Sequence, residues 1–202
     1  MIPSDASTAP AGRRERNKQQ KLARITAAAT ELFSTHGVDE VTTQQIAEAA
    51  DIGTGTLFLY AKNKAELLLL VQNVHYAEAI ETGLASAASA STPLDAIDAI
   101  VRPIVECNRR QIENGRTYLR ELVFGDPEEP HHRMGLELIQ QVDDAFVEIL
   151  VGDGRLDAGD AALLARTISA TMFISLASPI HLHSTDAEVC ADIREQVRVL
   201  LR

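Results

Sequence analysis

Apolar residues in the first third of the chain recur at the spacing of amphipathic helices. Between about Asn17 and His36 they return every three or four residues, and Gly37 follows as a typical stop signal. A second such pattern begins at Lys64, where Asn63 supplies a cap, and it continues into the rest of the chain. The pattern predicts two long helices that flank a shorter region.

The region between these helices carries the signals of two short helices joined by a tight turn. Thr42 and Gln45 have the spacing of a capping box at the start of the first short helix. After the turn at residues 51–53, Thr54 can cap a second one that we expect to run to about Tyr60. Two short helices around a tight turn are typical of a helix-turn-helix.

The remaining residues predict a body made of helices alone. Helical apolar patterns alternate with turn signals, and no strand pattern competes with them. Pro103 lies inside one of these patterns and should kink that helix. We therefore predict an all-α protein of about nine helices, with a disordered tail at 1–14, a helix-turn-helix domain at 15–64 and a helical body at 65–202.

The net charge of −10 argues at first against nucleic acid, but the charge is unevenly distributed. Six cationic residues lie between Arg13 and Arg24 with Glu15 as the one acidic residue, and no lysine follows Lys64. Such a division favours a basic arm that faces phosphates and an acidic body that stays away from the duplex.

Other features of the sequence limit the protein's location and chemistry. No run of eighteen apolar residues and no signal-peptide pattern occurs, so we expect a cytoplasmic protein without membrane contact. Cys107 and Cys190 lack the spacing of a metal site and are expected to be buried thiols. We expect no metal and no cofactor, because the paired histidines at 131–132 and at 181 and 183 lack further ligands at a suitable spacing.

Residues 25–67 resemble the DNA-binding domain of TetR family transcriptional regulators. The resemblance is carried by Ile25, Ala28, Ala29, Glu31, Leu32, Phe33, Gly37, Thr42, Thr43, Ile46, Ala47, Ala50, Gly55, Thr56, Leu57, Tyr60 and Lys64. The resemblance implies a regulator that binds a palindromic operator in double-stranded DNA as a homodimer. It also implies that a small-molecule effector modulates the binding, and that repression is the commoner mode of regulation. Asp51 departs from the pattern, which usually has glycine there, as does Phe58, where tyrosine is frequent.

The short helix that starts at Thr54 is the expected recognition helix, small enough to enter a major groove. Leu57 should face the core, so that hydroxyls and an apolar ring on the other side meet base edges. The family uses the positions of Tyr60 and Lys64 against phosphates, and the start of the preceding helix suits a phosphate as well. The expected DNA-binding residues are Thr43, Gln44, Thr54, Gly55, Thr56, Phe58, Tyr60 and Lys64.

A homodimer is expected because one short recognition helix reads too few base pairs. Small and apolar residues on the last two helical segments predict the interface, which we place at Ala165, Ile168, Ser169, Met172, Val189, Ile193, Val197 and Leu200. The alternative is that these residues form only the core of a single chain.

An effector cavity is expected inside the body, lined by its scarce aromatic and sulfur-containing residues. The candidates are Tyr118, Phe124, Met134, Phe146, Met172 and Phe173. Arg109, Arg116 and Arg120 lie close enough in sequence for one of them to orient an acidic group of a ligand. Ordinary core packing is the alternative for the aromatic and sulfur-containing residues, and exposure to solvent is the alternative for the arginines.

Two other classes of function compete with a regulator. A helical protein-interaction adaptor would need no basic arm, and a small helical enzyme would need nucleophile, base or metal groupings that the sequence does not assemble. The hydroxyl, tyrosine and lysine pattern of the head favours the DNA-binding regulator over both.

Overall fold

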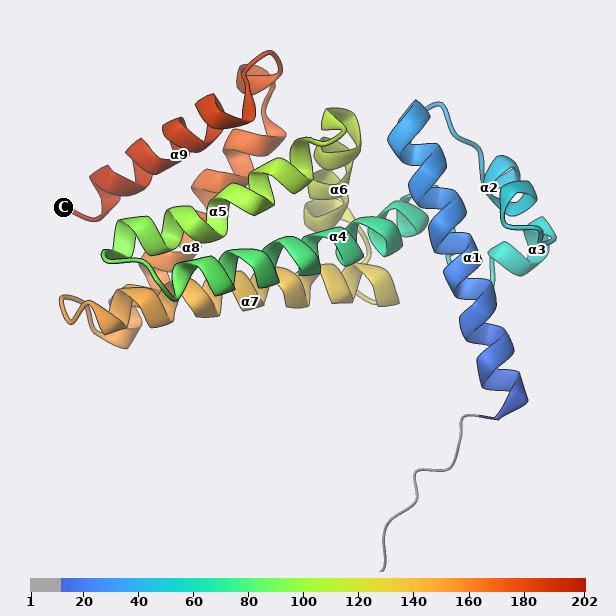
Figure 1. Cartoon of the computed structure of the whole chain (residues 1–202), viewed down its shortest axis with the longest axis horizontal. Coiled ribbons are helices and arrows are strands. Elements are labelled where there is room, and N and C mark those ends of the chain that lie inside the picture. Colours follow the sequence, from blue (N-terminus) through green and yellow to red (C-terminus); the bar gives the residue numbers. More distant parts are fainter. Residues whose placement is uncertain (1–11) are drawn as a thin grey trace, which may run out of the picture.

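The computed structural model describes residues 12–202, and this part of the chain is all helical (Figure 1). It contains nine α-helices and one short 3-10 helix. The fold class predicted from the sequence is therefore confirmed for these residues. The tail predicted for the first residues lies, up to residue 11, outside the described part.

The head is built from α1 (Arg13–His36), α2 (Thr43–Ala49) and α3 (Thr54–Leu57). The capping box predicted for α2 is present, because Thr42 accepts from the Gln45 backbone and the Gln45 side chain accepts from the Thr42 backbone. Two predicted boundaries were wrong. The first helix already begins at Arg13, so part of the basic run thought to end the tail is helical, and α3 ends three residues before Tyr60.

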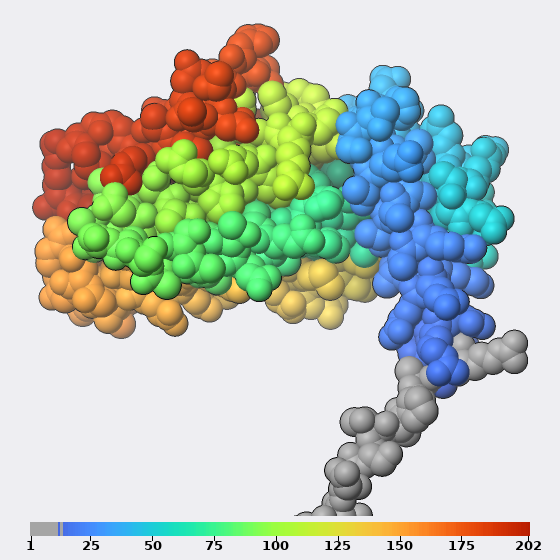
Figure 2. Space-filling view, in the orientation of Figure 1, coloured from blue at the N-terminus to red at the C-terminus, as the bar shows by residue number. Residues whose placement is uncertain are grey.

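The body contains the remaining elements: α4 (Lys64–Ala87), α5 (Pro93–Arg109), α6 (Ile112–Phe124), α7 (Pro130–Gly152), α8 (Ala158–Ala177), η1 (Pro179–His181) and α9 (Asp186–Leu200). The first turns of α4 are buried against the head, and its later turns pack against α5 and α7 (Figure 1). Helix α4 is thus shared by both parts, and one apolar core runs from head to body. Figure 2 shows the head at one end of the elongated body.

Close approach of the body helices depends on two glycines without side chains. A Cβ on Gly83 of α4 would lie 2.8 Å from the Cα of Ile100 on α5. A Cβ on Gly115 of α6 would lie 2.0 Å from the Asn108 carbonyl oxygen. Helices α4, α5 and α6 therefore pack at distances that any larger residue at these two positions would increase.

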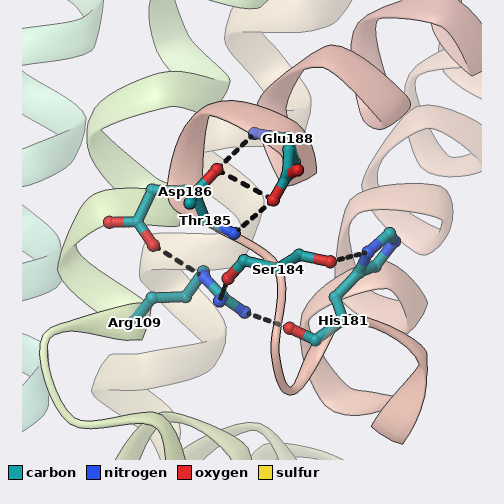
Figure 3. A network of polar contacts seen from close by, with 6 residues as sticks. All are labelled: Arg109, His181, Ser184, Thr185, Asp186 and Glu188. Carbon is teal, nitrogen blue, oxygen red and sulfur yellow. Dashed lines mark hydrogen bonds and ion pairs between the residues drawn. The ribbon is translucent and has the colours of Figure 1, made fainter.

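Arg109, at the end of α5, fixes the segment that precedes α9 (Figure 3). Its buried guanidinium donates to the Asp186 carboxylate at 2.7 Å and to the backbone carbonyls of His181 and Ser184 at 3.1 and 2.5 Å. Its donors are used within the fold, which leaves Arg116 and Arg120 as the candidates for orienting an acidic group of a ligand. The start of α9 follows directly, capped by Thr185 and Glu188.

Helix α8 differs from the other body helices because it is apolar without being deeply buried. It is the one helix of the described residues long and apolar enough to cross a membrane by length and composition, which alone is weak evidence. Only 28% of its apolar stretch is buried within the chain. The open side of α8 is therefore an exposed apolar surface of the kind that marks interaction sites.

Candidate nucleic-acid interface and effector cavity

The recognition helix α3 is held by one fully buried side chain and presents the rest of its surface to solvent. Leu57 is 0% exposed and packs in the core of the head. Gly55 is exposed, and a Cβ there would meet nothing within 4 Å, so the fold itself does not require glycine. Its small size instead leaves room for a close partner.

Basic residues of α1 face the recognition helix across a groove of about 1160 Å³. One wall carries Arg14, Lys18 and Lys21, and the other wall includes Thr56 and Tyr60. The Tyr60 hydroxyl spans the groove and donates to the Lys18 backbone carbonyl at 3.4 Å. The cationic run is thus one face of a helix beside the recognition helix, an arrangement that suits a phosphate backbone.

Leu59 is a candidate contact that the sequence reasoning missed. Its side chain is 82% exposed and lies at the edge of the same groove, next to Phe58, which is 45% exposed. Apolar side chains left open beside a recognition helix suit thymine methyl groups. The signal was present in the sequence, because Leu57 and Leu59 cannot both face inward at the end of so short a helix.

The other candidates lie at the start of α2 and α4. Thr43 opens α2, and Gln44 beside it is exposed and donates to Glu48 at 2.9 Å. Lys64 opens α4, and its ammonium donates to the Asp39 carbonyl, 3.1 Å away, in the loop before α2. The predicted DNA-binding residues therefore come from the starts of α2, α3 and α4 and from the turn that follows α3.

The body contains two neighbouring cavities. An outer groove of about 810 Å³ lies between α6, α7 and α8, and its apolar walls include Phe124, Phe173 and Ile174. An inner chamber of about 60 Å³ lies deeper and is almost entirely apolar, with Tyr118 and Met172 in its lining. The two cavities share Ile139, Ser169 and Phe173, so they adjoin each other.

Three arginines surround the outer groove, accompanied by two carboxylates. The cations are Arg116, Arg120 and Arg166, and the carboxylates are Glu113 and Asp143. Arg116 is held by Glu113 at 3.2 Å and by the Ala177 carbonyl at 3.1 Å. The Asp143 carboxylate accepts from the Ser169 hydroxyl, which occupies one of its acceptor sites. Arg120 is largely exposed and forms an ion pair with Glu121 at 3.7 Å, and Arg166 is exposed, so both guanidinium groups are open to solvent at the groove.

Four of the six predicted cavity residues line these cavities, and two do not. Phe124 borders the outer groove, Tyr118 and Met172 border the inner chamber, and Phe173 borders both. Phe146 is 0% exposed in the packed core and lines neither cavity, and Met134 is 47% exposed on the surface. Placing Phe146 and Met134 in the cavity was wrong, because α7 turns their faces toward the core and the solvent.

The predicted dimer interface requires a similar correction. Five of its eight residues, Ala165, Ile168, Val189, Ile193 and Val197, are at most 1% exposed because α8 and α9 bury them within the same chain. They cannot contact a partner directly. Ser169 and Met172 are half-buried and line the inner chamber, and Leu200 is 38% exposed. Only Leu200 of this set is open to a second chain.

Burial changes the proton affinity of several groups near the cavities. It raises the pKa of the Cys107 thiol to about 11 and raises the pKa of the Tyr118 hydroxyl well above its usual value. Burial also raises the pKa of Glu66, although nearby His131 opposes this effect. Among the described residues, no group of three histidine, cysteine or acidic side chains forms a metal site.

The head of this chain matches a known family of proteins in sequence. Residues 25–71 match the family model described as bacterial regulatory proteins, tetR family. This range covers the end of the groove-lining helix α1, the helix-turn-helix and the start of α4. No curated protein matches the sequence.

Several solved structures share the fold over nearly the whole chain. Thermus thermophilus FadR, a TetR family transcriptional repressor in complex with lauroyl-CoA, is 24% identical with a TM-score of 0.69, over 89% of this chain and 93% of that one. Bacillus subtilis FadR in complex with stearoyl-CoA is 18% identical with a TM-score of 0.64, over 88% and 96%. A TetR transcriptional regulator from Rhodococcus sp. RHA1 is 18% identical with a TM-score of 0.65, over 92% and 97%.

Proposed function

We propose that this chain, a member of the TetR family of transcriptional regulators, represses genes by binding a palindromic operator as a homodimer and is controlled by a small-molecule effector. Membership in this family makes it a regulator and not an enzyme. Beyond this family membership, we propose four properties of the protein: the palindromic geometry of its operator, repression of the genes it controls, its dimeric state and its response to an effector.

The observation that carries DNA binding is the basic groove between α1 and α3. Lys18 and Lys21 place positive charge beside a recognition helix of which Gly55 is exposed and Thr54 and Thr56 are half-buried. The net charge of the whole chain is −10, so nonspecific attraction to DNA has to come from this local concentration of cations. An adaptor that binds other proteins would have no need for this arrangement.

The direct test is selection of bound fragments from a genomic library, followed by mobility shifts with the selected site. A palindromic site with half-sites separated by about one helical turn or more supports the proposal. Transcription from a promoter that contains the site should fall when the protein is added. Binding that is equally strong to all fragments would contradict operator recognition.

The dimer interface that we now propose lies on the open faces of α8 and α9. Leu163, Ala170 and Ile174 lie along one exposed face of α8, and Val199 and Leu200 add exposed apolar surface on α9. Small Ala170 permits close helix contact. Because Ile174 also borders the outer groove, the partner subunit would close part of that groove.

For the effector, we propose an amphiphile with an apolar chain and a phosphorylated head, such as a long-chain acyl-CoA. The adjoining apolar chamber and the groove with Arg120 and Arg166 match the two ends of such a molecule. The complexes of the two FadR proteins with lauroyl-CoA and stearoyl-CoA support this choice. Calorimetry with lauroyl-CoA, coenzyme A and lauric acid tests the proposal, and tightest binding of the intact thioester is expected.

A further inference from the structure

The segment that follows the recognition helix is held by the first turn of α7. His131 donates from Nε2 to the Tyr60 backbone carbonyl at 3.0 Å, since a carbonyl oxygen can only accept. The ion pair between Lys62 and Glu129 joins the same two segments. Tyr60 is itself tied to α3, because its backbone N–H donates to the Leu57 carbonyl at 2.9 Å. The first turn of α7 is therefore linked to the segment that directly follows α3.

His131 is connected in turn to the body through buried side chains. Its backbone carbonyl accepts from Asn73 Nδ2 of α4 at 2.8 Å, and Asn73 Oδ1 accepts from the Tyr118 hydroxyl of α6 at 2.9 Å. Asn73 is 1% exposed and Tyr118 is 0% exposed. Without water to replace a broken bond, each link is costly to lose, so the three helices are held in one arrangement.

The inner end of this hydrogen-bond chain is in the wall of the inner chamber. The Tyr118 ring lines the chamber, whose volume of about 60 Å³ is far below the roughly 300 Å³ of a small ligand pocket. An apolar chain that enters must therefore push the chamber walls apart. The neighbouring Tyr76 also lines the chamber, with its ring centroid 4.6 Å from that of Tyr118, but it accepts from Asn108 instead.

We propose that Tyr118, Asn73 and His131 form a polar relay that couples the width of the inner chamber to the position of the recognition helix. Widening the chamber moves Tyr118 relative to α7 and thereby changes the bond from His131 to Tyr60. The three are positioning residues, since they act on DNA through α3. The relay rests on the proposed function for its biological role, and its effect is limited to the effector's differential affinity for the two arrangements.

The first test needs no effector and uses hydrogen exchange of the full-length free protein. Tyr118→Phe removes the hydroxyl that reaches Asn73 and keeps the ring in the chamber. Backbone amides at 58–64 should then exchange about threefold to tenfold faster, the effect of one lost buried hydrogen bond. His131→Ala should have the same effect on the same segment. The matched control is Tyr76→Phe, which should leave this segment unchanged.

Unchanged exchange at 58–64 in Tyr118→Phe would overturn the relay, and so would equal acceleration in Tyr76→Phe. A second arm measures affinity for the selected operator fragment with and without lauroyl-CoA. At lauroyl-CoA concentrations that saturate each protein, Tyr118→Phe should lose most of the change in DNA affinity that the wild type shows, whereas Tyr76→Phe should keep it. If the wild-type protein itself ignores lauroyl-CoA, the proposed effector class is wrong, and the exchange experiment still decides the relay.

Discussion

Arg24 of α1 donates two hydrogen bonds to Asp51, which lies in the turn between α2 and α3. One guanidinium nitrogen donates to the Asp51 carboxylate at 3.3 Å and the other donates to its backbone carbonyl at 3.0 Å. Asp51 has φ 51°, in the left-handed region that favours glycine, which is the residue that the family resemblance leads one to expect there. Aspartate tolerates this region better than most residues, and Arg24 stabilises the turn from outside.

The backbone cost of this turn can be measured by comparing Asp51→Ala with Asp51→Gly. Both variants lose the carboxylate contact with Arg24, but only glycine adopts the positive φ without a steric penalty. Asp51→Gly should therefore be more stable than Asp51→Ala by about 1 kcal/mol in urea unfolding. Equal free energies of unfolding would mean that the turn is not strained.

Structural features that depend on residues close together in the sequence could be predicted from the sequence. Which surface each apolar helix face packs against could not be predicted. The capping box at Thr42 is local chemistry and is present as predicted. Helical spacing also identified Val197 and Phe146 as apolar positions, but the same spacing is expected for a core, a cavity and an interface. Tertiary packing decides among these three, and it buried both residues within the chain.

Lys21 and Thr56 should separate phosphate contacts from base contacts on the head. Lys21→Ala removes one cation from the basic groove, so binding to all DNA should weaken alike and the salt slope should fall by about one per subunit. Thr56→Ala should instead cost on the order of 1 kcal/mol at one operator position and leave the salt slope nearly unchanged. Fluorescence anisotropy over a range of salt concentrations measures both quantities.

Two outcomes would contradict this division of roles. Equal losses on operator and random DNA for Thr56→Ala would remove Thr56 from the residues that read bases. A salt slope unaffected by Lys21→Ala would place the phosphates elsewhere on the head.

Charge on the open face of α8 or α9 should prevent dimer formation. Leu163→Glu and Val199→Glu introduce carboxylates at positions that are 57% and 52% exposed in the single chain, so folding should be unaffected. In a dimer through these faces, each carboxylate would be buried without a partner. Sedimentation at micromolar concentration should show monomers, and operator binding should weaken with them.

Val74→Glu is the matched control, since Val74 is 44% exposed on α4, away from the proposed interface. It should remain a dimer. If Leu163→Glu and Val199→Glu also remain dimers with full operator affinity, the interface lies on another face of the body.

Cys107 should resist thiol reagents as long as the body is folded. It is 4% exposed, and burial raises the pKa of its thiol to about 11. At pH 8 only about one thiol in a thousand is then ionised, and the thiolate is the reactive form. In a Cys190→Ser variant, where Cys107 is the remaining thiol, labelling with a disulfide reagent should be slow in buffer, faster as the pH rises, and complete in denaturant. Rapid labelling of native protein at pH 8 would show that α5 opens readily.

Arg120 should contribute to the affinity for the head of the effector and not for its chain. Its guanidinium borders the outer groove and is largely exposed, with only a 3.7 Å ion pair to Glu121, whereas Arg116 is held by hydrogen bonds to Glu113 and to a backbone carbonyl. Arg120→Glu reverses the charge at the groove and should weaken lauroyl-CoA binding by about tenfold or more, the range of a hydrogen bond to a charged group. Dodecanol has no anionic head, so its affinity should be nearly the same for the variant and the wild type.

Arg110→Glu is the control for net charge, because Arg110 is exposed and lines neither cavity. Calorimetry with both compounds gives the ratio of affinities, and a ratio left unchanged by Arg120→Glu would mean that the anionic head binds outside this groove.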